Sequence, residues 1–311
     1  MKKYLLKRTG LAIGIIVAIS IITFFILNII PGDPAALMLG DLASPETITK
    51  LREQMGLDRP LPEQYINWIK NLVTGNLGNS YFQKKPVLEL IGNAFYYTSR
   101  LAIYSYLIAL AIGITSGIIA AVFCGRKVDK ILMTIAITGI SAPAFWVAIL
   151  LQIYIALRFD IFPVSGVSST IGYVLPSISL GSRYAASIAR ITRNSMIETL
   201  NQDFIKTARA KGLKSHRIVL VHAFRNALLP IVTVIGSDIG SLLAGAMLTE
   251  SVFNIPGIGK LLIDAINKRD LPIVQGTVMY IAIVCVLIYL IVDILYALID
   301  PRIKLGDGIS G

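Results

Sequence analysis

Few residues in this 311-residue sequence have the types and spacing that chemistry at a site requires. The only histidines are His216 and His222, and the two cysteines, Cys124 and Cys285, are far apart in the chain. Four such isolated groups provide neither the clustered soft ligands of a zinc site nor the Cys-x-x-Cys pair of a redox motif. The sequence therefore predicts no metal site, no redox centre and no catalytic residues in this chain.

The string nearest to a phosphate-binding loop is Gly257-Ile258-Gly259-Lys260-Leu261. A complete loop of that kind reads GxxxxGK[ST], and its final hydroxyl binds Mg²⁺. Leu261 occupies the hydroxyl position here, so the Mg²⁺ ligand is missing. We therefore predict no ATP site and no bound cofactor in this chain.

Apolar residues dominate the elements that carry these groups. Hydrophobic residues make up 55% of the chain and charged residues 15%, whereas soluble domains average about 25% charged. A helix needs roughly 20 apolar residues to cross a bilayer. Uncharged runs of that length occur at 11–30, 101–123 and 131–157, and two more, each interrupted by one acid, occur at 228–248 and 273–299. The sequence thus predicts an all-α integral membrane protein.

Basic residues predict which loops face the cytoplasm. The segments 1–9, 126–130 and 190–225 are rich in Lys and Arg, which accounts for the net charge of +11 without nucleic acid as a partner. The segments 126–130 and 190–225 are separated by the span at 131–157. They can lie on the same side of the membrane only if a second, weakly apolar stretch between them, about 173–193, also crosses it. We therefore expect six transmembrane helices in the lipid bilayer of a bacterial cytoplasmic membrane, with both termini cytoplasmic.

These spans divide the chain into four parts. Residues 1–30 form the cytoplasmic N-terminus and first helix, and 31–100 form an extracellular region expected to make a packed lip over an outer vestibule. Residues 101–299 contain the other five helices and a cytoplasmic loop at 194–230. Residues 300–311 form a cytoplasmic tail. Pro143, inside the third span, can permit bending or close helix approach.

The cytoplasmic loop contains a short amphipathic helix. Asn201 is a candidate N-cap, Asp203 lies in the first turn, and Gly212 stands where a left-handed C-terminal residue belongs. At about 100° per residue, one face carries Phe204, Ile205, Ala208 and Gly212, and Lys206, Arg209 and Ala210 fall away from it.

Two interpretations of this helix remain open from its pattern alone. It can rest at anionic lipid headgroups, or it can dock on another protein. A lipid-surface helix favours Leu and Trp, whereas Ala208, Ala210 and Gly212 permit close backbone approach. The small residues favour the docking helix.

The same loop resembles the EAA loop of ABC importer permeases, in the version of the dipeptide/oligopeptide/nickel permease family. Matching residues are Asp203, Phe204, Ile205, Thr207 to Leu213, His222 and Arg225 to Pro230. Lys206 replaces the Glu of the general EAA pattern, Thr207 replaces its first Ala, and the spacing from Gly212 to Pro230 is longer. These departures are typical of this branch.

Other strings resemble the first-permease type of that family, in order, from residue 31 to residue 302. They are found at 31–35, 56–65, 75–80, 249–253, 256–259, 269–272 and 293–302. The resemblance implies the architecture of a type I importer permease, a transport subunit that is not an enzyme. It forms half of a translocation path for di- or oligopeptides.

The resemblance also implies the partners of the chain. They are a homologous second permease, two ATP-binding subunits that use ATP and Mg, and an extracellular solute-binding protein. The predicted helix would lie in a groove of one ATPase, with Phe204, Ala208 and Gly212 packing and Arg209 and Lys211 making polar contacts. The ATPase-coupling residues are Asp203, Phe204, Ile205, Thr207, Ala208, Arg209, Ala210, Lys211 and Gly212.

Two charged residues at membrane depth, Arg183 and Asp238, are functional candidates. Arg183 can face the translocation path and attract a peptide carboxylate. Alternatively, it can pair with Asp238, or with an acid of the partner permease, and fix helix packing. Asp293, nearer the tail, is interpreted as structural.

Other functions remain open from the sequence. Within the same family the cargo can be nickel, a metal chelate or another small organic solute, although a bare metal ion lacks a ligand cluster. An ion-coupled secondary transporter would place midplane acids in two inverted halves, a pairing that this sequence does not show. A receptor or scaffold without transport is the third alternative.

Overall fold

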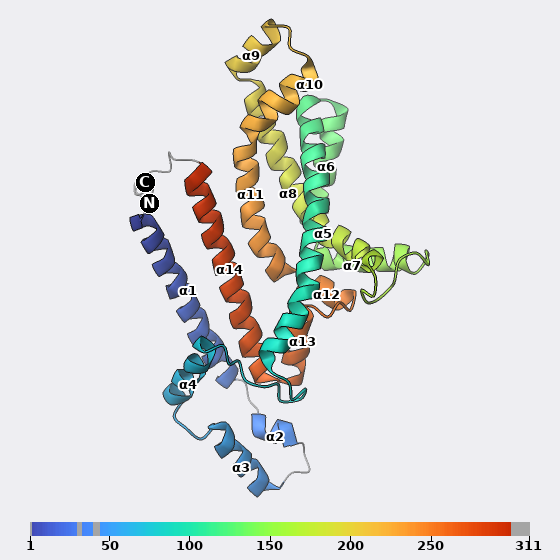
Figure 1. Ribbon diagram of the computed structural model, residues 1–311. Coiled ribbons are helices and arrows are strands. Elements are labelled where there is room, and N and C mark those ends of the chain that lie inside the picture. The colour runs from blue at the N-terminus through green and yellow to red at the C-terminus, as the bar shows by residue number, and fades with distance from the viewer. Residues whose placement is uncertain (1, 30–32, 40–43, 300–311) are drawn as a thin grey trace. The chain divides into compact units, whose positions relative to one another are not determined.

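The computed structural model describes residues 2–29, 33–39 and 44–299, and all regular elements in these ranges are helices (Figure 1). The predicted tail at 300–311, part of the turn at 31–34, and the side chain of Asp293 lie outside the described part. The chain divides into two compact units. The first consists of residues 1–98 and 256–290, and the second of residues 99–255 and 291–311.

The first unit begins with α1 (Lys2–Ile29), followed by three short helices, α2 (Pro34–Leu39), α3 (Pro45–Met55) and α4 (Leu61–Val73). It also contains the start of α5 (Val87–Val122), all of α13 (Ile258–Lys268) and most of α14 (Leu271–Ile299). Apolar and aromatic residues join α4 to α1. The ring of Phe24 lies 5.4 Å from that of Tyr65 and 5.9 Å from that of Trp68.

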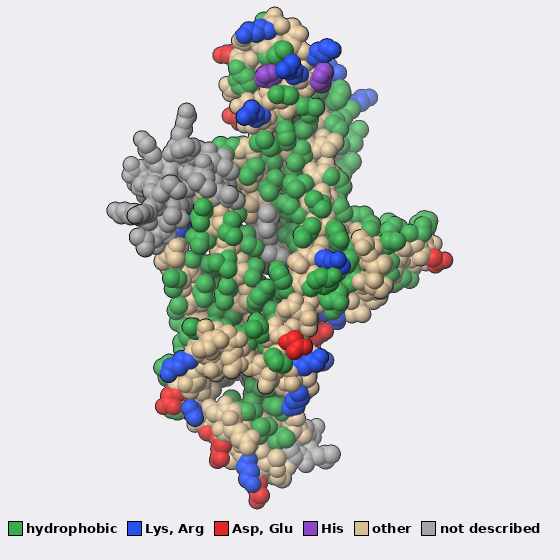
Figure 2. All heavy atoms as spheres, viewed as in Figure 1, with side chains coloured by type: hydrophobic (Ala, Val, Ile, Leu, Met, Phe, Trp, Pro, Cys, Tyr) green, Lys and Arg blue, Asp and Glu red, His purple; other side chains and the backbone are tan. Residues whose placement is uncertain are grey.

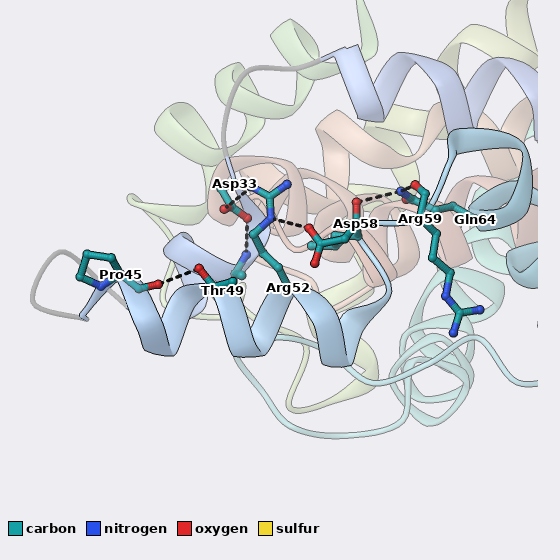
Figure 3. A network of polar contacts seen from close by, with 9 residues as sticks. Asp33, Pro45, Thr49, Arg52, Asp58, Arg59 and Gln64 are labelled. Carbon is teal, nitrogen blue, oxygen red and sulfur yellow. Dashed lines mark hydrogen bonds and ion pairs between the residues drawn. The ribbon is translucent and has the colours of Figure 1, made fainter.

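A polar network organises the turns around α3 (Figure 3). Arg52 donates from Nη1 to Asp33 at 3.1 Å and from Nε to Asp58 at 3.2 Å. The two carboxylates raise the pKa of Arg52, with Asp33 the larger cause. The side-chain amide of Gln64 donates to the carbonyls of Leu57 and Arg59. The two proline-containing turns of the predicted extracellular region are thus fixed by side chains between them.

The second unit contains the rest of α5, then α6 (Lys127–Ser141) and α7 (Ala144–Leu151), which continues as the π-helix η1 (Gln152–Ala156). A 3₁₀ turn, η2 (Thr170–Tyr173), leads into α8 (Val174–Leu200). The chain continues through α9 (Asp203–Ala210), α10 (Ser215–Arg217), the π-helix η3 (Ile218–Ala223), α11 (Phe224–Gly245) and α12 (Met247–Val252).

Helix α8 is the centre of this unit, because α6, α7 and α11 all pack against it. Three glycines let α5 approach it closely. A Cβ added at Gly113 would lie 2.7 Å from the carbonyl oxygen of Ala185, and one at Gly117 would lie 2.6 Å from the Cβ of Thr192. At Gly181, on α8 itself, an added Cβ would lie 2.6 Å from the carbonyl oxygen of Ser105.

Four described helical segments are long and apolar enough to cross a membrane, and a bent pair makes a fifth candidate. The four are Arg8–Ile26, Val87–Val122, Ser215–Gly236 and Leu271–Val292. They overlap the predicted first, second, fifth and sixth spans, although those at the second and fifth spans begin well before residues 101 and 228. The count of six membrane crossings remains a prediction.

The predicted span at 131–157 is not one straight helix, because the chain there turns by 102° between α6 and α7, and whether the bent pair crosses as one broken span stays a prediction. Pro143 explains the break. A proline disfavours the helical conformation of the preceding residue, and Ala142 accordingly adopts an extended backbone with φ −79° and ψ 127°.

The weakly apolar stretch at 173–193 does form a helix, α8, and most of its residues are buried inside this chain. Small and polar side chains such as Ser177 and Thr192 are fully buried there. The low hydropathy of this stretch therefore goes with packing against other helices of the chain. Whether α8 crosses the membrane stays a prediction.

Candidate functional site

Helix α9 begins three residues after α8 ends, and Gly212 follows its C-terminus. Gly212 has φ +75°, so the predicted left-handed residue is confirmed. The predicted N-cap is wrong. Asn201 has helical dihedrals and donates its N–H to the carbonyl of Glu198, closing the last turn of α8, and Gln202 precedes α9 instead.

The inner face of α9 consists of Ile205, which is fully buried, and Ala208, which is 7% exposed. Both belong to a hydrophobic cluster with Ala121 of α5 and Met196 of α8. The cluster also contains four residues from η3 and α11: Ile218, Ala223, Ala227 and Ile231. This short helix therefore contributes to a cluster that includes residues of three long helices, and the element that it contacts most is η3.

The outer face of α9 carries Phe204, whose side chain is 44% exposed although it is large and apolar. The other predicted coupling residues that are exposed are Asp203, Thr207, Arg209, Ala210, Lys211 and Gly212. Lys206 forms an exposed ion pair with Asp203 at 2.8 Å, which contributes little to stability. Figure 2 shows Lys, Arg and His side chains gathered where Figure 1 places α9 and α10.

Only part of the predicted apolar face of α9 is thus accessible from outside the chain. Phe204 and Gly212 are accessible, but Ala208 is covered by its own chain, and so is Ile205. The structure therefore differs from the prediction that Ala208 packs on a partner. Because packed cores transmit displacement instead of absorbing it, a force on Phe204 would reach Met196 and Ala121 through Ile205.

A second feature of this end of the unit joins α6 to α8. Arg193 donates from Nε and Nη2 to the two carboxylate oxygens of Asp129, at 2.6 and 2.8 Å. Asp129 also accepts from the backbone N–H of Gly125 at 2.8 Å, and its side chain is only 4% exposed. Sequence reasoning missed this pair, although an acid inside the basic segment 126–130 was a usable signal.

The two charged residues that the sequence predicts at membrane depth are on neighbouring helices. Arg183 is exposed on α8, and Asp238 is partly buried on α11. The charge of Arg183 acts on the Asp238 carboxyl, and Asp238 in turn acts on the hydroxyl of Tyr106. That hydroxyl donates to the carbonyl of Ile235 at 2.8 Å. Helix pairing and a path-facing role for Arg183 are both compatible with this arrangement.

Comparisons with known proteins cover nearly the whole chain. Residues 113–305 match the family model described as the binding-protein-dependent transport system inner membrane component, and residues 1–102 match the corresponding N-terminal model. The dipeptide transport system permease protein DppB of Escherichia coli K12 is 39% identical, over 98% of this chain and 99% of its own. The glutathione transport system permease protein GsiC of Escherichia coli O6:H1 is 41% identical, with the same coverage.

A solved structure agrees with these matches in its fold. A chain of the MetNI methionine ABC transporter, in an inward-facing conformation, superposes with a TM-score of 0.56 and 18% identity. The match covers 68% of this chain and 97% of that one. The chain belongs to the inner membrane component family of binding-protein-dependent transport systems.

Proposed function

We propose that this chain is the transmembrane permease subunit of an ATP-driven importer and forms half of a path for di- or oligopeptides. The observation that carries the proposal is the arrangement of α9. Its inner face belongs to a hydrophobic cluster that includes residues of three long helices, and Phe204, Arg209 and Lys211 are exposed. An element built in this way can receive force from a second protein and pass it to the helices of the path.

The proposed partners follow from family membership. They are a homologous second permease, two subunits that bind ATP and Mg, and an extracellular solute-binding protein. We place α9 and both termini on the cytoplasmic side. This orientation is supported by the concentration of basic residues in the segments 1–9, 126–130 and 190–225.

Within this assembly, the contact between α9 and an ATPase subunit rests on Phe204, Arg209 and Lys211, with Asp203, Thr207, Ala210 and Gly212 around them. Ile205 and Ala208 position the helix from below. The contact must differ between two states of the ATPase pair, because a partner shifts a conformational equilibrium only through differential contacts.

Peptide cargo is supported by the two relatives that match over their full length, which are named for dipeptide and glutathione transport. The proposed path role of Arg183 suits the same cargo, since a guanidinium attracts a peptide carboxylate. In this view Arg183 and Asp238 together form the polar part of the path within this subunit.

The direct test is uptake of a radiolabelled dipeptide into proteoliposomes that contain the complete complex. We expect uptake only when ATP is enclosed with the ATPase subunits and the solute-binding protein is on the other side. As a control, the purified chain alone is given a proton gradient without ATP. Uptake under that condition would instead identify an ion-coupled secondary transporter.

A further inference from the structure

A buried contact joins two segments that are 190 residues apart in the first unit. Asp270, which is 2% exposed, accepts a hydrogen bond from the Ser80 hydroxyl at 2.5 Å. It also accepts from the backbone N–H groups of Tyr81, at 3.2 Å, and Phe82, at 3.5 Å. Burial and the nearby Asp270 carboxylate raise the pKa of Tyr81 to about 12, so its phenol is neutral.

The contact fixes two tight turns. One is the loop from Ser80 to Lys85, closed by hydrogen bonds between the backbones of these two residues and from Lys84 N–H to the Ser80 carbonyl. The other is the turn between α13 and α14, where the N–H of Asp270 donates to the carbonyl of Ala265. Because one carboxylate holds both turns, their surfaces are presented together.

The exposed surface of these two turns is basic. It carries Lys84 and Lys85 from the loop and Lys268 and Arg269 from the second turn, and the aromatic ring of Phe82 is 45% exposed beside them. We call these five residues the Ser80–Asp270 surface. Asp270 is buried, and its carboxylate accepts the hydrogen bonds from Ser80, Tyr81 and Phe82, so it adds no exposed negative charge to this surface.

Backbone strain is concentrated on this surface. The described residues include three non-glycine residues with positive φ, and two of them are Lys84 at 56° and Arg269 at 55°. The third, Asn254 at 54°, is of a type that tolerates this conformation. Lys and Arg do not, and glycine would adopt it without strain. The chain therefore carries long cationic side chains at two positions where the backbone favours glycine.

Residues with a strained backbone persist where their side chains have a role. The property that Lys84 and Arg269 share is a positive charge. We propose that the Ser80–Asp270 surface docks an acidic face of the solute-binding protein of this transport system. The inference rests on the proposed function, which supplies the extracellular side and the partner.

A protein partner suits this surface better than lipid headgroups. Flexible lysines on any mobile loop can meet a fluid bilayer. The two turns instead hold together the backbones that carry four basic residues and the exposed Phe82, and protein interfaces are enriched in aromatic residues and Arg. Preorganisation of this kind reduces the entropy lost on binding a partner of fixed shape.

The test measures binding of the purified solute-binding protein to the complete complex in nanodiscs of neutral phosphatidylcholine, by surface plasmon resonance. The double variant Lys84→Gly/Arg269→Gly removes two charges and relieves both strained backbones. We expect its Kd to rise at least about fivefold, mainly through slower association at low salt. A merely structural role predicts an unchanged Kd in this variant, and that result would overturn the proposal.

Two further variants sharpen the result. Lys85→Glu/Lys268→Glu should weaken binding more strongly still, whereas Lys50→Glu, an exposed charge reversal on α3 of the same unit, should leave the Kd unchanged. If instead all effects appear only when anionic lipid is added to the nanodiscs, the surface binds headgroups and the proposal is wrong.

The same preparation separates this inference from the proposed function. Binding is read without transport, so a wild-type complex that binds the solute-binding protein but shows no ATP-dependent dipeptide uptake contradicts the function alone. A complex that transports dipeptide equally well at limiting solute-binding protein, with and without the Ser80–Asp270 surface charges, contradicts the docking inference alone.

Discussion

The guanidinium of Arg193 and the carboxylate of Asp129 form a two-point ion pair that joins α8 to the first turn of α6. Arg193 precedes Met196 by one helical turn, and Met196 belongs to the cluster that holds α9. The pair therefore fixes the position of α6 against the same part of α8 that supports α9.

Breaking this pair should destabilise the second unit. Because Asp129 is buried, Arg193→Ala leaves an uncompensated carboxylate and should lower the free energy of unfolding by about 2 kcal/mol. Differential scanning fluorimetry in detergent measures the effect. Lys130→Ala, an exposed neighbour, is the matched control and should change stability by less than about 0.5 kcal/mol. Equal melting temperatures for Arg193→Ala and wild type would contradict the structural role of the pair.

The close approach of α5 and α8 predicts a second effect. A Cβ at Gly113 would meet the backbone of Ala185 and the side chain of Ile188, both below 3.0 Å, so Gly113→Ala should destabilise the protein by about 1–3 kcal/mol. Gly92 lies on the same helix with open space around it, and Gly92→Ala should be neutral or stabilising by up to about 1 kcal/mol. In thermal unfolding, Gly113→Ala should therefore lower the melting temperature, and Gly92→Ala should leave it unchanged or raise it. A melting temperature for Gly113→Ala equal to that of Gly92→Ala would contradict the close approach of the two helices.

The two faces of α9 should respond differently to truncation. Ile205→Ala removes a fully buried side chain and should cost about 2–5 kcal/mol of stability. Phe204→Ala removes a half-exposed ring and should cost much less stability, while lowering ATP-driven uptake. Unfolding and uptake measured on the same preparations check this contrast. A larger stability loss for Phe204→Ala than for Ile205→Ala would mean that α9 is oriented the other way.

The path role of Arg183 has a test based on substrate chemistry. If its guanidinium attracts the peptide carboxylate, Arg183→Gln should reduce uptake of a free dipeptide more than uptake of the same dipeptide with an amidated C-terminus. The comparison uses proteoliposomes at saturating solute-binding protein. Equal losses for the two substrates would assign Arg183 to helix pairing with Asp238 instead.

Periodicity and composition were sufficient to predict the long helices. Residues 11–29, 101–122 and 273–299 of the predicted apolar runs are all in helices, and most of the weakly apolar segment at 173–193 is in the largely buried helix α8. Bending at Pro143 was named as a possibility, but its angle of 102° was not predicted, because a proline inside an apolar run is compatible with a kinked span or with a sharp turn. Contacts from η1 fix the choice, since the Gln152 amide donates to the carbonyls of Val164 and Val252.

The side of α9 that faces the core shows why the site could be predicted only in part from the sequence. Phe204 and Ile205 are adjacent in sequence and about 100° apart around the helix, so the pattern defines a wide apolar sector without saying which of the two points to the core. The burial of Ile205, in the cluster that also contains Met196, decides it. In the same way, the strings at 75–80 and 269–272 were recognised separately, and only the fold shows that Ser80 and Asp270 form a hydrogen bond.

The most direct test of the account is ATP-driven dipeptide uptake by the complete complex carrying Phe204→Asp, with Phe204→Leu as control. Asp places a charge in the proposed contact with the ATPase, whereas Leu keeps an apolar side chain there. We predict that uptake falls by at least about tenfold in Phe204→Asp, which corresponds to about 1.4 kcal/mol in the activation free energy of transport, and is largely retained in Phe204→Leu. Wild-type uptake by the Phe204→Asp complex would contradict coupling through α9.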